Sequence, residues 1–234
     1  SRGGAAGGVG SVAAAIGASQ GVTATGSVTV NIITNQTRAS SSGVVLTSSD
    51  AINLDADDVS SILSIAGSVA LSTSSAGVGI AGAYNEIGNE TVATVDGGSA
   101  NGKSVRIEAT EDADIQAIAA AGSGSAKVGV SGSLGINTIT SQTTASSHSA
   151  ALGASGNVTI RATDTSEILS ITGAASGAGT AAVGAAGSYN NIGGGVKAEL
   201  TGGSVNAANL ILDAERSGTL DVWAIAGSGA GTAG

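Results

Sequence analysis

The sequence contains no cysteine, proline, methionine or phenylalanine, and its only aromatic residues are Tyr84, Tyr189 and Trp223. The absence of cysteine excludes a disulfide scaffold. The near absence of aromatic side chains excludes an ordinary globular core, because aromatic residues supply much of the buried apolar area in such cores. Glycine is abundant instead, at 39 of 234 residues. The interior must therefore be thin, with backbones that approach one another closely.

Positive charge is also scarce. The chain has 8 Lys and Arg residues against 17 Asp and Glu, a net charge of -9 and a pI near 4.3. The few cations are scattered, so we expect no binding to nucleic acid or to anionic membrane surfaces. No stretch has the length and composition of a transmembrane helix, and we expect the chain not to be embedded in a membrane.

A repeat is the strongest positive feature. Asn-x-Ile, with Thr or Val six residues after the Asn and Ala eight residues after it, occurs four times at spacings of 54, 52 and 53 residues. The copies begin at Asn31, Asn85, Asn137 and Asn190. Repeats of this regularity indicate a solenoid, in which equivalent residues of neighbouring units stack. The asparagines would then form either an outer row that binds a ligand or an internal ladder of amides, and we favour the ladder because each amide can bond to its own copies.

A second repeated pattern alternates apolar and polar residues before an alanine, as in Val105-Arg106-Ile107-Glu108-Ala109. This period of two predicts half-buried strands with Arg106 and Arg161 facing solvent. The apolar positions of the four copies predict one continuous core row: Ile52, Leu54, Val105, Ile107, Val158, Ile160, Leu210 and Leu212.

Together these patterns predict an all-β chain that folds as a parallel β-helix, or β-solenoid, of repeats of about 53 residues. The approximate boundaries are 1–61, 62–114, 115–167, 168–219 and a partial repeat at 220–234, within one continuous segment. Each repeat would hold two coils of about 26 residues or three of about 18. The apolar parity from Val128 to Ile136 differs from that after Asn137, which predicts a bulge or corner at this asparagine.

The order of an Ala/Gly-rich strand, Asn-x-Ile, Thr-x-Ala and the alternating strand resembles the repeats of large secreted bacterial exoproteins of the filamentous haemagglutinin and leukotoxin-like filamentous adhesin type. The resemblance covers essentially the whole chain. It implies a right-handed parallel β-helix, an extracellular or bacterial cell-surface location, and a segment cut from a longer array. Neighbouring repeats, copies of the chain in a fibre and a host or neighbouring cell surface are the partners that it implies.

The function expected from this resemblance is that of a non-enzymatic structural and adhesive shaft. The alternatives are the solenoid portion of a secreted, leukotoxin-like cytotoxin and, third, a polysaccharide-active β-helix enzyme. We identify no catalytic residues, because His148 is the only histidine and there is no cysteine to complete a triad or a zinc site.

Acidic residues follow the alternating strand in every repeat. The densest group, Glu111, Asp112 and Asp114, is a candidate calcium site, because calcium prefers several oxygen ligands. We favour the alternative that these residues form a solvated acidic edge, which would keep the solenoid soluble and limit lateral association. No other cofactor is expected.

Overall fold

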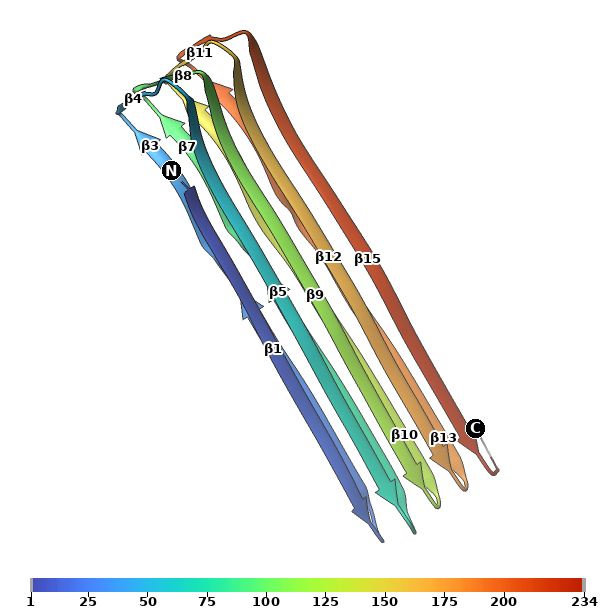
Figure 1. Cartoon of the computed structure of the whole chain (residues 1–234). Helices are drawn as coiled ribbons and strands as arrows, with labels where there is room; N and C mark the ends of the chain where they lie inside the picture. Colours follow the sequence, from blue (N-terminus) through green and yellow to red (C-terminus); the bar gives the residue numbers. More distant parts are fainter. Residues whose placement is uncertain (1, 233–234) are drawn as a thin grey trace.

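The computed structural model describes residues 2–232 and consists of fifteen β-strands, with no helix in that range. The strands belong to three parallel sheets, and the chain passes through all three in every turn of a β-solenoid (Figure 1). The predicted all-β parallel solenoid is therefore confirmed.

Sheet A holds the longest strands, in the order in which they occur in the chain. Its strands are β1 (Arg2–Ser19), β5 (Ala51–Ser72), β9 (Ser104–Ser125), β12 (Asn157–Ala178) and β15 (Asn209–Ala230). In β5, β9, β12 and β15, inward residues that are mostly small or apolar alternate with mostly polar outward residues over the first half of the strand, which favours this extended conformation.

Sheet B faces sheet A, and sheet C connects B back to A. The strands of sheet B are β2 (Thr23–Ile33), β3 (Gln36–Ser42), β6 (Ala76–Ile87), β7 (Glu90–Asp96), β10 (Val128–His148) and β13 (Ala181–Thr201). Those of sheet C are β4 (Val45–Thr47), β8 (Ser99–Gly102), β11 (Ala151–Ala154) and β14 (Ser204–Asn206). The first two coils divide the path through sheet B into two strands, whereas the next two cross it in one.

Each repeat forms a single coil. Val105 lies beside Val158 in sheet A, and Asn85 lies beside Asn137 in sheet B, so equivalent residues of consecutive repeats are nearest neighbours. The prediction of two or three coils per repeat was wrong, because strands such as the 22-residue β9 are far longer than the usual strand of 3–10 residues. The expected boundaries at 62, 115, 168 and 220 fall inside long strands of sheet A.

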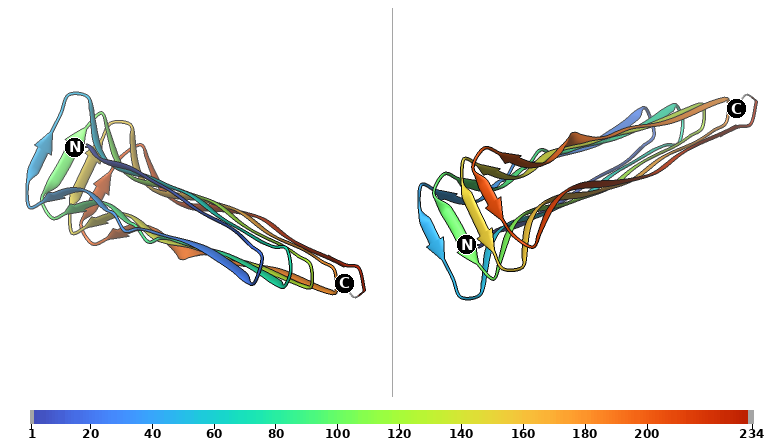
Figure 2. Two further views of the ribbon diagram at one scale, coloured as in Figure 1. Left: turned by 90° about the horizontal axis from the view of Figure 1, so that it is seen from below. Right: turned by 90° about the horizontal axis from the view of Figure 1, so that it is seen from above.

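The coil has the cross-section of a wedge. Sheets A and B are furthest apart where sheet C joins them, and they converge toward the turn at the other end (Figure 2). We call these regions the wide end and the tip. Small inward residues allow the convergence, since a Cβ atom on Gly79 would lie 2.3 Å from the carbonyl oxygen of Gly122 on the opposite sheet. The wide end holds larger inward side chains such as Ile107.

The tip reverses the expected orientation of the apolar residues in β10. Ser131, Ser133 and Asn137 are buried, whereas Val130 and Leu134 are 36% and 51% exposed. Alternation continues through Asn137 without a bulge, because β10 is one unbroken strand. The predicted change of phase was wrong: the space between the sheets at the tip admits only small side chains, so the larger ones face outward.

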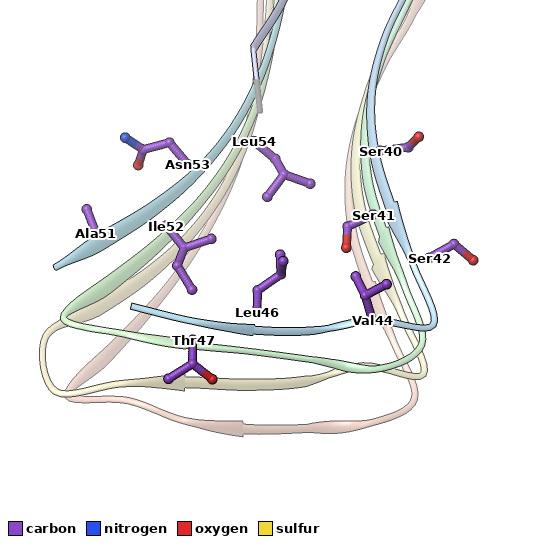
Figure 3. Close-up of a pocket in the computed structure, with 10 residues that line it drawn as sticks. All are labelled: Ser40, Ser41, Ser42, Val44, Leu46, Thr47, Ala51, Ile52, Asn53 and Leu54. Atoms are coloured by element: carbon purple, nitrogen blue, oxygen red, sulfur yellow. The ribbon is translucent and has the colours of Figure 1, made fainter. Parts of the chain in front are cut away.

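The core row lies at the wide end, as Figure 3 shows for the first coil, where Leu46, Ile52 and Leu54 point into the interior. Five members are at most 2% exposed: Leu54, Val105, Ile107, Val158 and Ile160. Ile52 is half-buried. It borders a hollow of about 550 Å³ that Leu46 and Leu54 also line.

The last two members of the predicted row are not buried. Leu210 and Leu212 lie in register with Val158 and Ile160, but they are 46% and 45% exposed. Their strand, β15, has a paired strand on only one side within residues 2–232. The row is therefore in the predicted register, and the exposure of its last two members goes with a strand that is paired on one side only within residues 2–232.

We predict that Val158→Asp lowers the free energy of unfolding by at least about 3 kcal/mol, because an unpaired carboxylate would replace a fully buried side chain. Arg161→Ala, three residues away, should change it by less than about 1 kcal/mol, because Arg161 lies on the outward face and the pair that it forms with Asp213 at 2.8 Å is partly exposed to solvent. Urea unfolding followed by circular dichroism measures both. The opposite order of sensitivities would show that the two faces of sheet A are inverted.

Candidate functional site: interior ladders and the outer surface

The repeated asparagines form a continuous ladder inside the solenoid. The Nδ2 of Asn31 donates to Oδ1 of Asn85, Asn85 donates to Asn137, and Asn137 donates to Asn190, each at 2.7 Å. Asn85 and Asn137 are fully buried. These amides therefore bind one another across coils, in an internal ladder and not in an outer row of ligands.

The ladder is also tied to the opposite sheet. Asn137 Nδ2 lies 3.1 Å from the Oγ of Ser170 on β12, and Ser170 exchanges a second hydrogen bond of 2.8 Å with Ser188 on β13. Side chains of sheets A and B thus meet at the level of the ladder. Because the amide supplies both a donor and an acceptor, the column satisfies its own polar atoms without water.

We predict that Asn137→Leu lowers the free energy of unfolding by about 1–3 kcal/mol, since the buried amides on both sides lose a partner. Asn157→Leu is the matched control, because Asn157 accepts a 3.0 Å bond from Asn209 on the exposed surface. Thermal unfolding of the two variants would separate these effects. Equal losses would mean that the interior ladder contributes no more than a surface bond.

Three of the acidic residues that follow the alternating strands, and for which the sequence predicts a solvated edge, form a second interior column. Asp58, Glu111 and Asp164 occupy the same position in successive coils of sheet A, and none is more than 1% exposed. Arg216 holds this position in β15. The expectation of solvation was wrong for these residues, because strand alternation places them on the inward face.

Hydroxyl donors from sheet B, and an amide donor from the break between β6 and β7, bind the first two carboxylates. Thr37 donates to Oδ2 of Asp58 at 2.8 Å. Thr91 donates to Oε2 of Glu111 at 2.7 Å, and Asn89 donates to Oε1 of the same residue at 2.8 Å. The threonines six residues after the first two ladder asparagines, Thr37 and Thr91, thus each bind a buried carboxylate. The repeat shows these threonines as a pattern, but the sequence does not show the contact.

The third carboxylate is bound differently. Asp164 accepts a 2.7 Å bond from Ser166 through Oδ1, while its Oδ2 has no hydrogen-bond partner and lies 3.7 Å from Nε of Arg216. Thr143, which is in register with Thr91, also has an unpartnered buried hydroxyl. At Asp164, electrostatic attraction to Arg216 therefore replaces the hydrogen bond that a threonine donates to Asp58 and to Glu111.

Burial in the column raises the pKa of Glu111 to about 7, against the opposing effect of the hydrogen bonds from Thr91 and Asn89; the negative charges of Asp58 and Asp164 raise it further. Burial likewise raises the pKa of Asp164, while the bond from Ser166 and the charge of Arg216 lower it. Glu111 and Asp164 therefore take up protons more readily than carboxylates on the surface do.

This shift predicts a loss of stability as the pH rises. Between the ordinary value of 4.5 and about 7, Glu111 is protonated in the folded chain and ionised in the unfolded chain. The folded state then holds more protons, so the free energy of unfolding falls across this window, by up to about 3 kcal/mol. Glu111→Gln should remove the fall, whereas Asp112→Asn, on the outward face, should retain it. Unfolding curves at pH 5 and pH 8 measure the difference, and a wild-type chain that gains stability toward pH 8 would contradict the assignment.

The candidate calcium site does not form. Glu111 faces the interior, whereas Asp112 is exposed on the outer face, and the Oδ2 of Asp114 accepts a 2.9 Å bond from Gln116. Residues of opposite parity on one strand cannot converge on an ion. No group of three or more potential ligands that could hold a metal occurs within residues 2–232.

His148 ends β10 at the corner between sheets B and C. It is half-buried and in register with Asp96 and Thr201 of the neighbouring coils. Ser149, which follows it, has a φ of 51°, which makes the sharp turn toward sheet C. The position of His148 is thus that of a corner residue.

Charge is divided unevenly over the outer surface. Ion pairs occupy the outer face of sheet A toward the wide end, where Arg106 pairs with Glu108. In contrast, residues 59–85 and 168–196, which form the tip of two coils, contain no charged residue, and residues 115–137 contain only Lys127. Many exposed apolar side chains lie in these segments, including Ile80 and Leu134.

Comparison of the chain with family models, curated proteins and solved structures finds no match. Within the described residues, no helix has the length and hydropathy needed to cross a membrane.

Proposed function

We propose that the chain is a non-enzymatic structural and adhesive shaft of an extracellular bacterial fibre or surface exoprotein. The observation that carries the proposal is the continuity of bonding along the solenoid axis. Long strands of every coil pair in register with the next coil, and the asparagine ladder adds a buried side-chain bond at each step. A stack bonded in this way transmits load between neighbouring units.

The interior polar groups also support a structural role. Carboxylates are frequent catalytic groups, but Asp58 and Glu111 are buried between two sheets, where Thr37 and Thr91 bind them. A polymeric substrate would need access to such groups, and neither side chain is more than 1% exposed. The extracellular location and the cell-surface partners rest on the resemblance of the repeats to those of secreted exoproteins.

The mechanical part of this proposal is testable by single-molecule pulling. We expect discrete unfolding events in which coils detach from an end. Each coil of 53 residues would release about 190 Å of contour length, at about 3.6 Å per residue. Asn137→Leu should lower the force of the events, and Asn157→Leu should not.

A featureless extension without discrete events would contradict the shaft. The enzymatic alternative is tested separately by incubating the chain with a panel of polysaccharides and measuring new chain ends. Cleavage that disappears in Glu111→Gln or His148→Ala would overturn the non-enzymatic assignment.

A further inference from the structure

The outer face of sheet B carries an apolar area at the tip of the wedge. We define the tip face as the outward residues within 24–30, 78–84, 130–136 and 183–189, which lie in register in β2, β6, β10 and β13. None of these residues is charged. Apolar areas of this kind on a protein surface commonly mark sites of association.

Large and small side chains alternate across the middle of the tip face. Along one row, Val28 is followed by Gly82, Leu134 and Gly187 in successive coils. The adjacent row, two residues earlier in each strand, has the reverse order: Gly26, Ile80, Gly132 and Ala185. Each large residue therefore has a small neighbour beside it, and a hollow of about 570 Å³ lies over Gly132, Ala185 and Gly187.

The outward glycines are not required by the coil itself. A Cβ on Gly132 would come no closer than 3.9 Å to another atom, and on Gly82 and Gly187 no closer than 3.6 and 3.7 Å, which are ordinary contacts. Inward Gly184 differs, because its Cβ would lie 2.6 Å from the carbonyl oxygen of Gly227. A glycine within a strand costs about 0.5–1 kcal/mol, and it often marks the close approach of another backbone. The coil itself leaves the space over these glycines unfilled, so a group that fills it would come from outside the coil.

We propose that the tip face is an interface between two copies of this chain, which pair side by side with their solenoid axes parallel. A two-fold axis parallel to the solenoid, placed midway between the two alternating rows, relates the two copies. It sets each large residue of one copy opposite a small residue in the equivalent coil of the other copy. Val28 then faces Gly26 of the second copy, Ile80 faces Gly82, and Leu134 faces Gly132. The flanking row of Val78, Val130 and Val183 faces the row that contains Tyr84 and Ile136.

A second copy fits this face better than a lipid surface does. Knobs and pits occur on the same surface at the same spacing, which is the condition for a self-complementary interface, whereas lipid chains need no pits. The same two-fold axis directs the charged wide ends of the two copies to opposite sides. The net charge of -9 on each chain therefore opposes this pairing little.

The area of the tip face sets the expected strength. Four coils about 4.8 Å apart, with about seven residues of strand at 3.4 Å each, cover roughly 450 Å² per copy. Stable interfaces bury about 800 Å² per partner, so this chain should pair weakly, with a dissociation constant of the order of micromolar or above. Each additional coil would add about 110 Å² by the same spacing.

Sedimentation velocity over a range of concentrations tests the pairing. The wild-type chain should shift from monomer to dimer as its concentration rises. Leu134→Asp should weaken the dimer at least tenfold, and so should Gly132→Val, which fills a pit where an added Cβ comes no closer than 3.9 Å to another atom of the single coil. Leu63→Asp is the matched control, because Leu63 is 46% exposed on the outer face of sheet A, against 51% for Leu134. Circular dichroism establishes that each variant is folded.

A wild-type chain that stays monomeric to about 1 mM would overturn the interface. So would loss of the dimer in Leu63→Asp but not in Leu134→Asp, which would assign the pairing to sheet A. Binding to phosphatidylcholine vesicles that Leu134→Asp abolishes, without any dimer, would assign the face to lipid. The pairing rests on the proposed shaft function only in that it gives the shaft a lateral partner. The two are tested separately, because a chain that stays monomeric would leave the result of the pulling experiment unaffected.

Discussion

Every position in this solenoid lies about 4.8 Å from its own counterpart in the next coil, and this constraint decides which residues each column can hold. An asparagine column satisfies it, because an amide donates to one neighbour and accepts from the other, as Asn85 does. A column of ionised carboxylates does not, because neighbouring negative charges repel each other and an ionised carboxylate has no hydrogen-bond donor. The column of Asp58 and Glu111 is accordingly bound by threonines from the opposite sheet, and one of its members has a pKa near neutrality.

A second constraint is the separation of the two long sheets. At the wide end they are far enough apart for Ile107 and Ile160, so apolar residues point inward as in an ordinary sheet sandwich. Toward the tip the interior narrows to alanine, serine and glycine, and the larger side chains turn outward. The same narrowing therefore explains both the thin core and the apolar outer surface on which lateral pairing is proposed.

The regular spacing of the repeats made part of this structure predictable. Stacking of Asn137 on Asn190 and burial of Val158 follow from equal intervals and from alternation. The direction of Glu111 was also present in the sequence, four residues after Ile107 and hence on the same strand face, but its charge argued for solvent. The orientation of Leu134 could not be predicted, because alternation identifies two faces without saying which is inside. That choice depends on the distance to the opposite sheet, which is a tertiary property.

The assignment of one whole coil to each repeat has a consequence for reach. A helix of 53 residues would extend about 80 Å, whereas 53 residues of this chain advance the solenoid by only about 4.8 Å. Most of the polypeptide therefore extends across the solenoid, along the strands, and little of it adds to the length of the solenoid axis. A fibre built this way would be flat in cross-section and would resist bending in the plane of its wedge. It would present the outer faces of sheets A and B as two broad surfaces along its whole length.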